Sequence, residues 1–117
     1  MIFRQKALII HGKFYNTSIL AHEMGHCLGL YHTHHGTVKE AGDDKQCKEF
    51  VDGSNSARCG DYIADTPADP NKWNECSYVG ADLDGHGQRY VPDPSNYMSY
   101  ADPQCCTRFS DLQKERM

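Results

Sequence analysis

Three histidines and one glutamate stand at a spacing that could hold a catalytic metal ion. His22, Glu23 and His26 form the pattern H-E-x-x-H. Residues four apart lie on one face of an α-helix, so the two histidines can bind a single zinc ion. Gly29 and His32 extend the pattern, and a left-handed turn at the glycine would bring in the third ligand. Three protein ligands leave one position open, which is typical of catalytic zinc sites.

The chemistry expected of such a site is hydrolysis of peptide bonds. Zinc lowers the pKa of a coordinated water toward neutrality and polarises the carbonyl of the bond to be cleaved. Glu23 lies beside the ligands without being one of them, so we expect it to act as general base on this zinc-activated water. The sequence therefore predicts a zinc-dependent metalloendopeptidase whose partner is a protein or peptide substrate.

One helix has to position these groups, and the sequence predicts it at about residues 18–29. Residues 16–18 offer side-chain oxygens that could cap its first turn, and Gly29 marks its end. A short buried strand is expected before it, at residues 7–10. A second, short helix is predicted to start at Ser110, because Ser110 and Gln113 fit a capping box.

The segment from about 33 to 103 is rich in Gly, Asp, Asn and Pro and shows neither helical nor strand periodicity. The six cysteines of this 117-residue chain indicate that disulfide bonds pin it, in an oxidising setting. A zinc cluster of cysteines is disfavoured because no C-x-x-C pair occurs. Cys47 and Cys59 would close a short loop and are one expected pair. Cys27 is expected to be a buried free thiol, and Cys106 stays unassigned.

Composition excludes some classes of function. The net charge of −4 argues against nucleic-acid binding, and no apolar run is long enough to span a membrane. The length allows one domain. The other four histidines are not expected to bind the metal ion. Each is expected to be solvated or locally hydrogen-bonded; they are His11, His34, His35 and His86.

The chain resembles the metzincin metalloproteases, in particular the pappalysin group with its cytophagalysin and ulilysin-like members. The extended zinc motif and a downstream methionine turn carry the likeness to metzincins. The narrower match adds residues spread from Ile19 to Met117. They are Gly60, Asp61, Asp65, Thr66, Pro67, the run Asn96–Tyr100 around Met98, Cys105, Phe109, Gln113 and Arg116.

This resemblance implies an α+β, zincin/metzincin-like fold and a secreted enzyme whose signal peptide lies upstream of this chain. The active-site helix would be followed by an irregular, disulfide-pinned C-terminal subdomain at about 30–117 and a short final helix. Residues 1–117 would then form a partial metzincin catalytic domain that lacks most of the N-terminal subdomain. Pocket residues are expected from the loop between about Asp61 and Tyr97.

The resemblance also implies roles for individual residues. Met98 would be the turn methionine beneath the zinc ligands, and Tyr100 would be a catalytic residue that steadies the oxyanion. A possible calcium ion would be bound by Asp61, Asp65 and Thr66, whose oxygens suit that cation. A disulfide between Cys76 and Cys105 follows from the same likeness.

Three other functions are compatible with parts of the pattern. A non-catalytic metal-binding fragment, or a binding module derived from such a protease, would keep the histidines without cleaving peptides. A structural zinc domain is disfavoured by the open fourth position. A hydrolase acting on non-peptide amides is disfavoured by the match around Met98 and Asp61.

Overall fold

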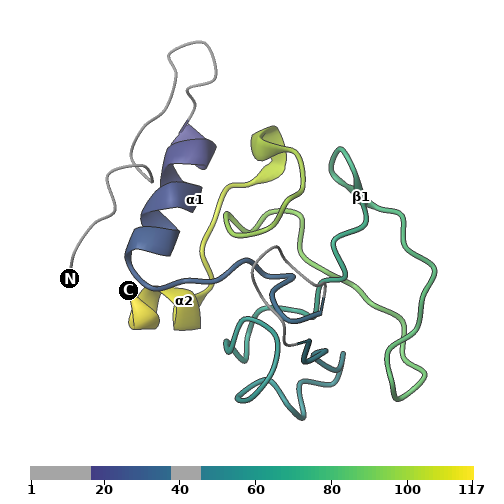
Figure 1. The fold of residues 1–117 in the computed structure, drawn as a ribbon. Helices are drawn as coiled ribbons and strands as arrows, with labels where there is room; N and C mark the ends of the chain where they lie inside the picture. The colour runs from purple at the N-terminus through teal and green to yellow at the C-terminus, as the bar shows by residue number, and fades with distance from the viewer. Residues whose placement is uncertain (1–16, 38–45) are drawn as a thin grey trace.

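The computed structural model describes residues 17–37 and 46–117. The predicted strand at 7–10 and His11 lie outside these residues. The regular elements of the described part form a small α+β structure (Figure 1). In chain order they are helix α1 (Thr17–Cys27), strands β1 (Trp73–Asn74) and β2 (Ser77–Tyr78), the 3₁₀-helix η3 (Pro103–Cys105) and helix α2 (Asp111–Arg116).

Helix α1 is the element predicted at 18–29, and it begins and ends slightly earlier than expected. Its last turn closes with two hydrogen bonds, from the Leu30 N–H to the Gly25 carbonyl at 2.9 Å and from the Gly29 N–H to the His26 carbonyl at 3.1 Å. Gly29 has a φ of 100°. This is a Schellman motif, in which a residue without a Cβ takes the left-handed position. The glycine therefore ends the helix and redirects the chain toward His32.

The long segment after α1 is irregular, as predicted. Its only regular pairing among the described residues is the hairpin of β1 and β2, in which Trp73 faces Tyr78. Two isolated bridges add to it, and one of them joins Asn96 to Arg108. Since so few backbone groups pair in sheets, side-chain contacts and covalent links have to hold this segment.

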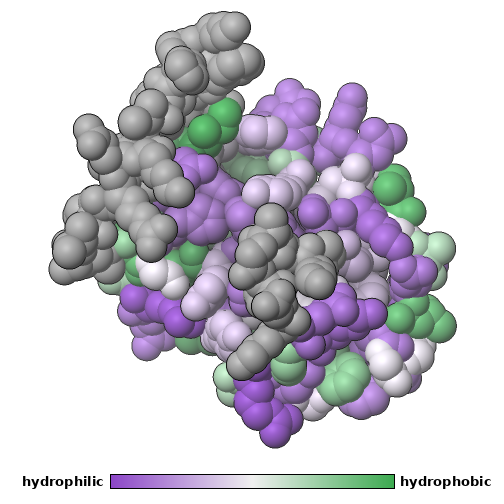
Figure 2. All heavy atoms as spheres, in the orientation of Figure 1, coloured by the Kyte–Doolittle hydropathy of each residue, from purple (hydrophilic) through white to green (hydrophobic). Residues whose placement is uncertain are grey.

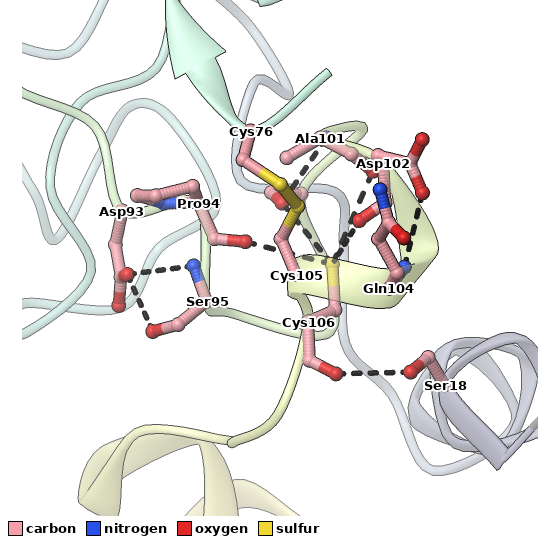
Figure 3. The surroundings of a disulfide bond; sticks show 11 residues. Ser18, Cys76, Asp93, Pro94, Ser95, Ala101, Asp102, Gln104, Cys105 and Cys106 are labelled. Carbon is pink, nitrogen blue, oxygen red and sulfur yellow. Dashed lines mark hydrogen bonds between the residues drawn. A yellow bond between two sulfur atoms is a disulfide. The ribbon is translucent and has the colours of Figure 1, made fainter.

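Two disulfide bonds supply these links. Cys47 is bonded to Cys59 and Cys76 to Cys105, which confirms both predicted pairs. The second bond ties the hairpin to η3 (Figure 3). Cys27 and Cys106 are free thiols. Cys106 is the buried one, whereas Cys27 is only half-buried and not buried as expected, because it lies at the C-terminal end of α1.

Helix α2 starts with the predicted capping box, and its glutamine has a second role. The Gln113 side chain is fully buried and accepts a hydrogen bond from the Ser110 N–H at 2.8 Å. Its amide also pairs twice with the Asn96 amide, at 2.8 and 3.1 Å. Asn96 in turn accepts from the N–H of Met98 at 2.9 Å. The final helix thus fixes the conformation of the methionine turn.

The visible surface is largely hydrophilic, with hydrophobic residues mostly gathered near its margins (Figure 2). Among the described residues, no helix has the length and apolar character needed to cross a membrane.

Candidate metal centre

Three histidine side chains converge on one point beside α1. The Nε2 atom of His26 lies 3.1 Å from that of His22 and 3.0 Å from that of His32. Nitrogens bound tetrahedrally to zinc at its usual distance would be about 3.3 Å apart. In the described part of the chain, this is the one group of at least three His, Cys, Asp or Glu side chains close enough to share a metal ion. The structure therefore brings together the three predicted ligands.

The outer nitrogens of two rings are fixed by the backbone. His22 Nδ1 lies 2.6 Å from the Tyr97 carbonyl oxygen, and His26 Nδ1 lies 2.9 Å from the Leu30 carbonyl oxygen. A carbonyl oxygen can only accept, so each Nδ1 carries the proton and each Nε2 presents its lone pair to the centre. Metal-binding histidines are commonly oriented in this way.

Burial disfavours the charged form of two of the imidazoles, His22 and His32. It lowers the pKa of His22 below its ordinary value. Burial, followed by the nearby His26 and His34, lowers the pKa of His32 to about 2. Neutral imidazole is the form that binds metal ions, so the surroundings favour the binding form.

A methionine packs against α1 between the first two histidines. Met98 has no exposed surface. A Cβ atom at Gly25 would lie 2.6 Å from its sulfur and 3.3 Å from both Leu30 Cδ1 and Phe109 Cε1. Position 25 therefore has to be glycine if the methionine is to approach the helix this closely. Its predicted place beneath the histidines stays a prediction, and the need for Gly25 was not foreseen.

Tyr100 and His34 surround the third histidine. The Tyr100 ring lies 4.4 Å from the His32 ring and is 52% exposed. The His34 ring stacks on His32 at 4.7 Å with an angle of 12° between the planes. His34 is only 2% exposed, so it is not solvated, and the other predicted alternative, a local hydrogen bond, stays a prediction. Its ring lies 4.7 Å from the Tyr100 ring, a long-range contact that spacing alone does not reveal.

Two other histidines lie at the surface. His35 is half-buried between the Tyr31 and Tyr62 rings, at 4.4 and 5.9 Å. His86 stacks on Phe50 and lies 3.4 Å from the Asp52 carboxylate. The His86 side chain is 46% exposed, in agreement with the prediction that it is solvated.

A cavity of about 280 Å³ opens beside the histidines. Glu23 and His22 both border it, so the predicted general base and a predicted ligand face the same space. The remaining lining comes from the start of α1 and from the segment around η3: Ser18, Ile19, Tyr97, Ser99, Tyr100, Ala101, Pro103 and Cys106. Of the loop expected to supply pocket residues, only Tyr97 contributes. The expectation concerned the primed-side pocket, and it stays a prediction.

A second polar cluster lies in the disulfide-bonded segment. Both oxygens of the Asp61 carboxylate accept from the Thr66 hydroxyl, at 2.8 and 2.6 Å. The Glu49 carboxylate is 2% exposed, and its Oε1 atom has no hydrogen-bond partner among the described residues. Burial, with the charge of Asp61 adding to it, raises the pKa of Glu49 to about 8. Burial also raises the pKa of Asp61 to about 7.

Gly60 makes room for this cluster, because a Cβ at that position would lie 2.2 Å from the Glu49 Oε1 atom. Of the three predicted calcium ligands, Asp61 and Thr66 lie together. Asp65 is exposed, and its carboxylate accepts from the Leu112 N–H in the first turn of α2. The sequence analysis did not include Glu49 in this cluster, because no pattern in the residues next to it in sequence indicates that it is buried.

Known proteins similar to this chain are proteases. An extracellular metalloprotease of Colletotrichum graminicola is 38% identical over 97 residues, which are 82% of this chain and 28% of that protein. Pappalysin-1 of Mus musculus and of Homo sapiens are each 32% identical over 115 residues, which are 94% of this chain and 7% of those proteins. The sequence matches no established family model.

The chain thus spans at most 28% of the length of these relatives. The match to Pappalysin-1 extends over 94% of this chain, so it spans the stretch from His22 to Met98. The geometry of the histidines and the names of the relatives both support a metal site of the metalloprotease type. Over most of its length, the chain is therefore homologous to part of an extracellular metalloprotease and of Pappalysin-1, which supports the resemblance to the pappalysin group of the metzincins.

Proposed function

We propose that this chain carries the catalytic centre of a zinc-dependent metalloendopeptidase. The observation that carries the proposal is the convergence of three Nε2 atoms, from His22, His26 and His32, beside a cavity that Glu23 also borders. The metalloprotease relatives support the same reaction class. Residues 1–117 would form part of a larger metzincin catalytic domain.

The donor set fits zinc, because imidazole nitrogens are ligands that this ion prefers and the backbone orients two of the three rings. When bound, zinc supplies Lewis-acid chemistry, which polarises the scissile carbonyl and makes a water molecule more acidic. Glu23 would take the proton from the attacking water and pass it to the leaving amine. Tyr100 lies over His32 and could donate a hydrogen bond to the oxyanion.

The experiment is cleavage of an unfolded protein by the chain, refolded oxidatively and loaded with zinc. We expect peptide-bond cleavage that a chelator abolishes and that one equivalent of zinc restores, because the histidines hold the ion reversibly. Cleavage is followed by mass spectrometry of the fragments, and bound zinc is measured in parallel.

The alternative function is a metal-binding fragment or binding module without catalysis. It predicts one zinc per chain and no cleavage products. A chain that binds no zinc at all would exclude both functions. Cleavage that persists in the chelator would exclude a metal-dependent mechanism.

The setting proposed for the enzyme is extracellular. Relatives are named extracellular metalloproteases, and both disulfide bonds suit an oxidising compartment. Its substrates would be proteins or peptides.

We also propose that the polar cluster around Asp61 binds calcium. Buried carboxylates need a compensating cation or hydrogen bonds, and Glu49 Oε1 lacks a partner among the described residues. Glu49, Asp61 and Thr66 offer oxygen atoms, which are the ligands that calcium takes. Glu49 thus replaces Asp65 in the predicted ligand set.

Calcium is expected to raise the melting temperature of the chain by several degrees. An ion present at about a hundred times its Kd adds roughly 2.7 kcal/mol to the free energy of unfolding. In the Glu49→Gln variant the increase should be lost, whereas Glu115→Gln, an exposed change on α2, should keep it. Scanning calorimetry with and without calcium measures this, and equal shifts in all three proteins would contradict the site.

A further inference from the structure

We propose that a second pocket, between α2 and residues 56–64, binds the C-terminal residue of a peptide whose last side chain is apolar. Arg116 would receive the terminal carboxylate, and the walls of the pocket would cover the side chain. The inference goes beyond the proposed function, because it does not involve the histidine centre.

The pocket is separate from the cavity beside His22 and Glu23. Its volume is about 380 Å³, within the range of about 300–1,000 Å³ that is usual for ligand sites. The two share no lining residue. Helix α2 lies near the C-terminal end of α1 and contributes Leu112 and Arg116, which are four positions apart on one helix face (Figure 1). The remaining lining comes from residues 56–57 and 62–64.

Apolar side chains form most of the walls: they are Ala57, Tyr62, Ile63, Ala64 and Leu112. Leu112 is 37% exposed and Tyr62 is 39% exposed, so both hold apolar surface in contact with water. The removal of such surface from water is stabilising in proportion to its area. The walls therefore favour a guest with an apolar side chain.

Arg116 is the one charged residue of the lining, and its side chain lies against a group of aromatic rings. Its guanidinium carbon is 5.9 Å from the centre of the Tyr31 ring, which is within the range of a cation–π contact. The Tyr31 ring lies 4.4 Å from the His35 ring and 5.4 Å from the Tyr62 ring. Tyr62 belongs both to this aromatic group and to the pocket wall. The cation is therefore placed relative to the walls before a ligand arrives.

Tyr62 takes a backbone conformation that a tyrosine rarely adopts. Its φ is 64°, which lies in the left-handed region. Residues in this region cluster at functional sites, because the surrounding structure has to hold them there. Here the strained residue is the one whose ring joins the support of Arg116 to the pocket wall.

The hydrogen-bond donors of Arg116 are available to a ligand. Among the described residues, its guanidinium makes no hydrogen bond or ion pair. Its charge acts on Asp61, but Asp61 is 1% exposed and both its carboxylate oxygens accept from the Thr66 hydroxyl. The Asp65 carboxylate accepts from the Leu112 N–H. Since a guanidinium presents two parallel N–H groups that match a carboxylate, a carboxylate of the ligand is the partner that fits.

The open form of the pocket favours the end of a chain over a free small acid. Of the seven lining residues, five are exposed: Ala57, Tyr62, Ala64, Leu112 and Arg116. Sites for free small molecules usually bury about 70–90% of the ligand surface. A pocket with so exposed a rim covers one residue and lets the rest of the chain continue into solvent. A leucine or phenylalanine with its terminal carboxylate is a guest of this kind.

The test uses the zinc-loaded Glu23→Ala chain, in which the proposed cleavage is too slow to consume peptides. The probes are one hexapeptide that ends in leucine, with a free carboxylate or a terminal amide, and the same peptide ending in serine with a free carboxylate. Binding in the pocket is followed by the methyl NMR signals of Ile63 and Leu112 and the Nε–H signal of Arg116. The Ile19 methyl signal reports the other cavity.

We expect the leucine acid to shift all three pocket signals. It should bind at least about tenfold tighter than the amide, which lacks the charge, and than the serine peptide, which lacks the apolar side chain. Inorganic phosphate carries charge without an apolar body, so it should leave the three signals unchanged.

Two matched variants test the role of the cation. Lys114 and Arg116 are both exposed on α2, but only Arg116 lines the pocket. Arg116→Gln should lower the affinity for the leucine acid about tenfold or more, to that of the amide. Lys114→Gln removes the same charge two residues earlier and should stay within about twofold of the parent. Circular dichroism verifies that both variants are folded.

Equal binding of the leucine acid and its amide would overturn the proposal, as would equal effects of the two variants. Shifts of the pocket signals by phosphate would mean that charge alone accounts for binding, and would overturn it too. The free acid 4-methylpentanoate, which has the leucine side chain and no peptide, tests the source of the carboxylate. It should bind at least about fivefold more weakly than the leucine acid. Equal or tighter binding would assign the pocket to free acids and overturn the peptide terminus as its ligand.

Discussion

Replacement of Glu23 by alanine is expected to lower kcat for peptide cleavage by about 10²- to 10⁴-fold while the chain still binds one zinc ion. The size of the loss is that of a missing general base. Glu23 borders the cavity beside His22, where a proton acceptor has to stand. The measurement is the initial rate of cleavage of one peptide at saturating concentration, together with the zinc content of each protein.

Zinc affinity should be nearly unaffected, because the orientation of the ligands does not depend on this side chain. The backbone carbonyls of Tyr97 and Leu30 hold His22 and His26. The control is Glu115→Ala, which removes the same charge from an exposed position of α2. This variant should keep the parent rate. A Glu23→Ala variant that cleaves as fast as the parent would exclude the proposed role of Glu23.

Replacement of Gln113 by leucine is expected to lower the free energy of unfolding by about 3 kcal/mol. The change leaves the Asn96 amide and the Ser110 N–H buried without their partner, and each such group costs about 1–3 kcal/mol. Leucine matches the size of glutamine, so little of the loss comes from an empty volume. Urea unfolding followed by circular dichroism gives the difference.

The same variant should also weaken zinc binding, because Asn96 positions the methionine turn that packs against α1. Gln104→Leu is the matched control, since Gln104 is exposed, and it should change stability by less than about 0.5 kcal/mol. A loss below about 1 kcal/mol in Gln113→Leu would mean that the amide pair with Asn96 contributes little.

The local part of the site could be predicted from the sequence. The spacing of His22, His26 and His32, with Gly29 between the last two, depends on helix geometry and on the backbone freedom of glycine. The structure brings the three histidines together and gives Gly29 a φ of 100°. The capping box at Ser110 is local as well, and the structure confirms it. Such patterns are readable because neighbours in sequence are also neighbours in space.

Long-range contacts could not be predicted in the same way. Glu49 lies beside Asp61 only because the loop closed by Cys47 and Cys59 folds back, and no periodicity marks that fold. The burial of His34 depends on Tyr100, which is 66 residues away in the chain. The resemblance to metzincins supplied one such long-range contact, since it implied the Cys76–Cys105 bond.

The adjacent cysteines 105 and 106 pose a problem of pairing during oxidative folding. In the unfolded chain either thiol closes a loop of nearly the same length with Cys76, so loop entropy does not distinguish them. The folded structure does, because the Cys106 thiol is buried among carbonyl groups (Figure 3). Burial raises its pKa, which leaves little thiolate to attack the neighbouring bond. The native pairing is therefore protected from exchange only after η3 has packed against α1, and refolding yield should depend on a redox buffer that lets wrong pairs reopen before that step.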